Sequence, residues 1–154
     1  MTMTIRLLSL AMFLCLVYNQ TASQTPDSLR LLQTLPVKAT FAATDNLSNV
    51  YLITPDNAIE KYAPDGRRLT RYSNNRLGNP TRLDVSNPLK VLVWYADFRM
   101  VLFLDRSLTE LGNLNLITAG YPEVRAVASA QDGNLWLYDE VNFRLVKITP
   151  EGEK

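Results

Sequence analysis

Histidine is absent from the 154-residue sequence, and cysteine occurs only once, at Cys15. Histidine is the side chain that ordinarily titrates near neutral pH. Its absence excludes a Ser-His-Asp triad, a histidine general base and a zinc site built on imidazole. A single cysteine excludes an intramolecular disulfide and a metal site built on several thiolates. The sequence therefore predicts no catalytic residue, no metal ligand set and no cofactor, although calcium is kept below as part of an alternative.

A surplus of charge of either sign is also missing. The 16 Lys and Arg residues nearly balance the 15 Asp and Glu residues, and the formal net charge is +1. Bulk charge therefore gives no reason to expect nucleic acid or an anionic membrane as a partner. The one basic cluster contains Arg67, Arg68, Arg71 and Arg76. It is either a contact for an anionic glycan or partner or, more simply, a solvated strand edge that discourages pairing.

Long hydrophobic runs are confined to the N-terminus. Arg6 precedes an apolar run over residues 7–18, and small or polar residues follow it. This order is typical of a secretory signal peptide, which we place at residues 1–23. The run falls short of the roughly 20 apolar residues that cross a bilayer. An uncleaved anchor and a lipoprotein modified at Cys15 are the alternatives. We expect an extracytoplasmic protein, periplasmic or secreted, without a membrane span after signal removal.

Short apolar strands recur along the rest of the chain at a spacing of about forty residues. Equivalent strands begin near Val50, Val91 and Leu135, which are 41 and 44 positions apart. Each is followed by a polar turn and a second apolar strand. Such repeats are typical of the blades of a β-propeller, small sheets that must stack on one another to bury their faces. The predicted fold is all-β, a partial propeller whose blades of four antiparallel strands occupy residues 37–73, 80–116 and 122–154.

The pattern within the strands predicts which faces are buried. Residues 91–95 and 100–104 are apolar throughout, which suits strands covered on both sides, so the second blade should lie between the other two. Alternation in the next blade puts Leu135 and Leu137 on one face and Trp136 on the other. One of these faces must meet a neighbouring blade. The aromatic residues either line a ligand-binding end or, as we favour, pack between blades.

Residues 24–35 precede the first blade as a linker, and residues 29–35 are placed to act as a strand that closes a propeller ring. A propeller usually has 4 to 8 blades of four strands, and the third repeat lacks its fourth strand. Three repeats do not close a ring as a monomer. We expect either the N-terminal part of a longer propeller, truncated before its C-terminal blades, or a dimer in which two half-rings complete each other.

The third repeat also carries a motif order that resembles a known family. The turn at residues 132–134 (Asp-Gly-Asn) leads into an aromatic strand, and residues 142–144 (Asn-Phe-Arg) lead into a further strand that ends at residues 150–152 (Pro-Glu-Gly). This arrangement resembles the NHL-repeat and related six-bladed β-propellers. The chain is also similar to uncharacterised exported propeller proteins of Bacteroidetes-type bacteria. The resemblance implies a six-bladed ring and supplies no ligand.

Carboxylates gather at the predicted turns and support two hypotheses on function. We expect a non-enzymatic binding or scaffolding module of the cell envelope, which contacts an unidentified protein, small molecule or glycan through loops at one end of its blades. The alternative is a calcium-dependent hydrolase or lactonase-like enzyme, in which carboxylates hold the ion. Asp and Asn also accept backbone hydrogen bonds in tight turns without any metal, which is the simpler role.

Particular residues follow from these hypotheses. Asp45, Asp84 and Glu123 could face a central channel, where the enzyme alternative would need them. The predicted binding residues lie around one set of turns and are Asp56, Tyr95, Asp97, Asp139 and Asn142.

Overall fold

A computed structural model describes residues 29–153, so the predicted signal peptide and residues 24–28 lie outside the described part. The residues from Leu35 onward form one compact unit, and residues 29–34 belong to a separate one. Residues 29–39 contain no strand, and Leu29 and Leu31 are exposed. The ring-closing role expected of residues 29–35 stays a prediction. No helix within residues 29–153 has the length and apolar character needed to cross a bilayer.

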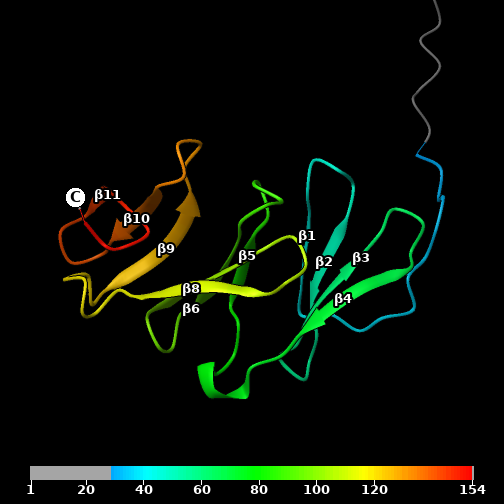
Figure 1. Ribbon diagram of the computed structural model, residues 1–154, viewed down its shortest axis with the longest axis horizontal. Helices are drawn as coiled ribbons and strands as arrows, with labels where there is room; N and C mark the ends of the chain where they lie inside the picture. The colour runs from blue at the N-terminus through cyan, green and yellow to red at the C-terminus, as the bar shows by residue number, and fades with distance from the viewer. Residues whose placement is uncertain (1–28, 154) are drawn as a thin grey trace, which may run out of the picture. The chain divides into compact units, whose positions relative to one another are not determined.

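Eleven strands in the described residues form three antiparallel sheets, which we call blades 1, 2 and 3 (Figure 1). In each blade the strands follow one another as a meander, which confirms the prediction of an all-β partial propeller. Blade 1 contains β1 (Phe41–Thr44), β2 (Val50–Ile53), β3 (Ile59–Tyr62) and β4 (Arg68–Tyr72). Blade 2 contains β5 (Arg82–Asp84), β6 (Val91–Tyr95), β7 (Met100–Leu104) and β8 (Glu110–Asn115). Blade 3 contains β9 (Val124–Ser129), β10 (Leu135–Asp139) and β11 (Arg144–Ile148).

Blade 2 is buried on both faces, as its apolar strands predict. On one face, Val93 and Leu102 join a cluster with Tyr51 and Ile59 of blade 1. On the other face, side chains of β6 and β7 that include Trp94 join a second cluster with blade 3. Continuous apolar strands are therefore explained by two interfaces, one on each side of the same sheet.

Blade 3 is covered on one face only within the described residues. Leu135 and Leu137 pack against blade 2, whereas Trp136, on the opposite face of β10, is 41% exposed and Leu145 is 68% exposed. The predicted alternation is confirmed, and the leucine face is the one that meets a neighbour. The prediction that tryptophans pack between blades is confirmed for Trp94. For Trp136 it stays a prediction, because blade 2 covers the opposite face of β10.

The turn between the second and third strands repeats one backbone feature in every blade. Asn57, Arg99 and Phe143 have φ values of 64°, 51° and 49°. Each lies at the end of its turn, just before β3, β7 or β11. The left-handed region favours glycine, and a residue with a Cβ is destabilised there by roughly 1–2 kcal/mol. The three turns therefore share a strained backbone geometry with three different side chains.

The link between blades 1 and 2 contains the one helical element of the described residues, a 3-10 helix over Asn75–Leu77 called η1. No pattern in the sequence predicts this helix. The side chain of Asn74 accepts a hydrogen bond from the backbone N–H of Arg76 (3.1 Å) and so caps its start. Gly78 ends it at a φ of 72°.

Candidate functional site

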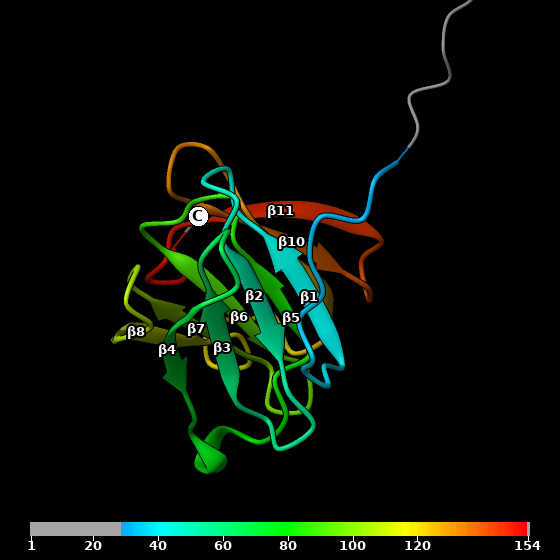
Figure 2. The same cartoon turned by 90° about the vertical axis from the view of Figure 1, so that its right-hand side faces the viewer.

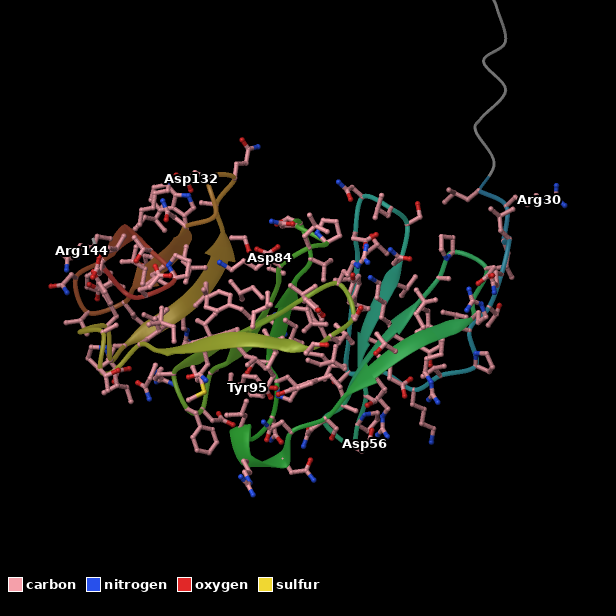
Figure 3. The ribbon with its side chains drawn as sticks, in the orientation of Figure 1. Arg30, Asp56, Asp84, Tyr95, Asp132 and Arg144 are labelled. Carbon is pink, nitrogen blue, oxygen red and sulfur yellow. The ribbon has the colours of Figure 1, made fainter. Side chains whose placement is uncertain are left out.

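The predicted binding residues lie in or next to equivalent turns of the three blades. Asp56, Asp97 and Asn142 lie in the turns β2–β3, β6–β7 and β10–β11, while Tyr95 and Asp139 end β6 and β10. Figure 3 shows Asp56 and Tyr95 near the ends of their sheets. The sequence repeat therefore identified one set of turns.

Tyr95 belongs to the core. It is 1% exposed and packs in the cluster between blades 1 and 2. Burial, with a smaller contribution from the charge of Glu110, raises the pKa of Tyr95 to about 12. Its side chain is therefore not available to a ligand, whereas Asp97, in the turn itself, is exposed.

Asp139 and Asn142 are partners of each other. The Asn142 side-chain amide donates to Asp139 (2.8 Å), and the Arg144 Nε also donates to it (3.1 Å). The hydrogen bond from Asn142, followed by that from Arg144, holds the pKa of Asp139 below its ordinary value. Asp56 forms an ion pair with Arg71. Three of the five predicted residues therefore already have protein partners.

Other turn carboxylates have the same structural role. Asp45 is 7% exposed and accepts hydrogen bonds from the backbone N–H groups of Leu47 and Asn49 (both 2.9 Å) and from the hydroxyl of Tyr51 (3.2 Å). Burial opposes its ionisation, but these hydrogen bonds outweigh burial and lower the pKa of Asp45. Asp105 likewise accepts from two backbone N–H groups of its own turn. The simpler role of these carboxylates is therefore confirmed, since they close turns.

Between residues 29 and 153, no three Asp, Glu, His or Cys side chains come together in a way that could hold an ion. Glu123, one of the acids considered for a channel, instead accepts from Arg99 (3.3 Å).

The basic cluster of blade 1 is partly neutralised. Glu60 is only 6% exposed and accepts from Arg68 (3.0 Å) and from the hydroxyl of Tyr62 (2.5 Å). Arg71 lies 3.4 Å from the same carboxylate, and Arg67 lies 3.9 Å from Asp65. The cluster is thus an ion-pair network on blade 1 more than a free cationic surface.

A second candidate site lies where the first strands of the blades come together. β1 and β5 run side by side (Figure 2). The first turns of the three blades, β1–β2, β5–β6 and β9–β10, surround an open hollow of about 450 Å³. Its lining is uncharged and consists of Asn46, Ser86, Asn87, Pro88, Ser129, Ala130 and Gln131.

Asp84 lies beside this hollow and joins two of its walls. Its carboxylate accepts from the backbone N–H of Ser129 in blade 3 (2.6 Å) and from that of Ser86 in its own blade (3.0 Å). Figure 3 shows Asp84 on the side of β5 that faces β9. Burial opposes ionisation, but the hydrogen bonds from Ser129 and Ser86 lower the pKa of Asp84. This carboxylate therefore joins two blades at the edge of the hollow.

The hollow is not among the predicted sites, although the sequence contains one signal for it. The first turn of every repeat carries a carboxamide, Asn46, Asn87 or Gln131. Asp45 and Asp132 adjoin two of these carboxamides and carry a charge, so the sequence pattern points to the acids first. The common position of the carboxamides becomes meaningful only when the blades are stacked.

Comparison with known proteins supports the fold. No family model and no curated protein matches the sequence. Among solved structures, a protein of unknown function from Bacteroides caccae is 19% identical with a TM-score of 0.52, and the match covers 73% of this chain and 46% of that one. Virginiamycin B lyase from Staphylococcus aureus is 12% identical with a TM-score of 0.51, over 70% and 36% of the two chains. The WD40 repeats of RRP9 are 13% identical with a TM-score of 0.50, over 78% and 41%.

These similarities are to β-propeller proteins and establish a propeller-type fold. The chain spans 36–46% of the length of these three proteins. Identity below 20% says nothing about a shared ligand or reaction, because one propeller fold supports many functions.

Proposed function

We propose that this chain contributes three blades to an exported, non-enzymatic β-propeller that binds or scaffolds a partner in the cell envelope. Export is inferred from the N-terminal pattern of Arg6, an apolar run and small residues. The lyase among the structural neighbours means that the fold alone does not exclude an enzyme, so the chemistry of the side chains must decide.

The observation that carries the proposal is the use already made of the acidic side chains. A general base works best when its pKa lies near the operating pH. The pKa values of Asp45, Asp84 and Asp139 are instead lowered from an already low ordinary value, because donors in their own turns or in a neighbouring blade stabilise the carboxylate. These acids are ionised, already accept hydrogen bonds from the protein, and are weak bases. They suit a rigid scaffold that presents turns better than a hydrolytic centre.

Calcium titration separates this proposal from the enzyme alternative. The mature protein, beginning near Gln24, is titrated with calcium chloride in a calorimeter, and its thermal unfolding is followed with and without the ion. We expect neither a binding heat nor a shift in the melting temperature. Stoichiometric calcium binding that raises the melting temperature would overturn the non-enzymatic assignment and favour the hydrolase.

Export has its own test. Cells that produce the full-length chain are fractionated, and the N-terminus of the recovered protein is determined by mass spectrometry. We expect extracytoplasmic protein that starts close to Gln24. Recovery from the cytoplasm with Met1 still present would refute export.

A further inference from the structure

We propose that the hollow formed by the first turns of the three blades binds an uncharged carbohydrate. The inference rests on the proposed function, because it names the site and the ligand class of the binding module.

The walls of the hollow match the hydrogen-bonding character of sugars. Carboxamides come from Asn46, Asn87 and Gln131, and hydroxyls come from Ser86 and Ser129. A carboxamide offers both donors and acceptors, and a hydroxyl does the same. A sugar hydroxyl also donates and accepts, so it can pair with Asn46 and Gln131 in either direction. The Ser86 and Ser129 hydroxyls hydrogen-bond to Asp84, which leaves their oxygens as acceptors for a sugar. These donors and acceptors come from three blades, so they can contact a ligand from three sides.

The carboxamides are available for a ligand. Within residues 29–153, no hydrogen bond engages the side chains of Asn46 and Gln131. Asn87 uses its Oδ1 to accept from the backbone N–H of Leu89 (3.0 Å), which fixes the side chain and leaves its NH₂ group as a donor. One anchored and two unengaged carboxamides therefore line the same space.

Anionic ligands do not fit this environment. Asp45 and Asp132 are the sequence neighbours of Asn46 and Gln131, but the first closes its own turn and the second is paired with Lys147. No lining residue is charged. An anionic ligand would give up water without meeting a cationic side chain in the lining, which is unfavourable.

The shape and the lining also favour a sugar over a peptide. Peptide recognition usually needs apolar pockets for side chains, and only Pro88 and Ala130 are apolar here. The volume of about 450 Å³ falls within the range of roughly 300–1,000 Å³ that is typical of small-molecule sites. Asp84 holds the backbone on two sides of the hollow through Ser86 and Ser129. A wall fixed in this way reduces the entropy lost on binding.

The test observes the carboxamides directly. The full chain, labelled with ¹⁵N, is titrated separately with neutral disaccharides (cellobiose, maltose and lactose), with a uronic-acid disaccharide and with a capped neutral dipeptide. Side-chain amide signals of Asn and Gln are followed by NMR and assigned with the variants below. We expect at least one neutral disaccharide to shift the signals of Asn46, Asn87 and Gln131, and the uronic-acid sugar and the dipeptide to leave them unchanged.

Variants separate the hollow from the rest of the surface. The double variant Asn46→Ala/Gln131→Ala should weaken disaccharide binding by about tenfold, since it removes two modest hydrogen-bonding groups. The matched control is Asn75→Ala, an exposed carboxamide of η1, which should bind as the wild type does. Equal melting temperatures for all three proteins establish that the fold is unchanged.

Three outcomes would overturn the proposal: no disaccharide shifts the hollow signals, the double variant binds as tightly as the wild type, or only the dipeptide or the charged sugar binds. In the last case the carbohydrate assignment fails while the binding module of the proposed function survives. A calcium-binding protein with no disaccharide affinity would instead defeat both.

Discussion

Replacing Asp84 by Asn removes a carboxylate that joins blades 2 and 3. The wild-type side chain is half-buried and accepts from Ser129 (2.6 Å) and Ser86 (3.0 Å). The amide of Asn keeps one acceptor oxygen, so at least one of these N–H groups must face an NH₂ group. Hydrogen bonds to charged groups contribute about 1.5–3 kcal/mol. We therefore expect Asp84→Asn to lower the free energy of unfolding by about 2 kcal/mol at pH 7.

Urea unfolding followed by tryptophan fluorescence measures this loss. With a denaturant slope of about 2 kcal/mol/M, a loss of that size moves the midpoint by about 1 M. Asp97→Asn is the control, because Asp97 is an exposed turn residue, and its midpoint should stay within about 0.3 M of the wild type. Equal midpoints for the two variants would refute the role of Asp84 as a link between blades.

The pH dependence of the loss provides a second check. The pKa of Asp84 is lower in the folded state than its ordinary value of 3.8. Its contribution is therefore fully present above about pH 4, the unfolded value, and disappears as the pH falls through the folded value. The difference between wild type and Asp84→Asn should be constant from pH 5 to 8 and shrink below pH 4. A difference as large at pH 3 as at pH 7 would show that charge is not its origin.

Two further substitution pairs test the packing and the backbone. Leu137→Ala, at a fully buried position, should cost about 2–5 kcal/mol of unfolding free energy, whereas Trp136→Ser, on the exposed face of the same strand, should cost less and reduce binding of the dye ANS. Equal losses in urea unfolding would contradict the assignment of the two faces. Gly78→Ala should cost about 1–3 kcal/mol, because the φ of 72° disfavours a side chain and the new Cβ would lie 2.5 Å from the Phe98 ring, while Gly112→Ala has open space and should be nearly neutral. A similar thermal shift for both glycine variants would refute this account of η1.

The strands and their buried faces could be predicted because they depend on local pattern. Residues 91–95 and 100–104 were predicted with the bounds that β6 and β7 have in the structure. Period-2 alternation in β10 separated Leu137 from Trp136 correctly. These properties follow from the alternation of side chains along a strand, which can be recognised within a few residues.

The candidate sites depend on information that no single repeat contains. In β6 every residue is apolar, so the sequence does not show which neighbour Tyr95 faces, and a predicted ligand contact is in fact part of the core. The hollow requires three turns to converge, which is set by the rotation from one blade to the next. The role of Glu60 was also hidden, because its arginine partners follow in β4, the next strand of the same blade.

The positive φ values of Asn57, Arg99 and Phe143 bear on how such chains diverge. An amide, a guanidinium and a phenyl ring occupy the same left-handed corner, so the backbone bend there does not depend on one type of side chain. Substitutions at these corners therefore lower the sequence identity between one blade and another without changing the backbone geometry. The likeness of the three blades at this corner is therefore preserved in the backbone torsion angles and not in the sequence.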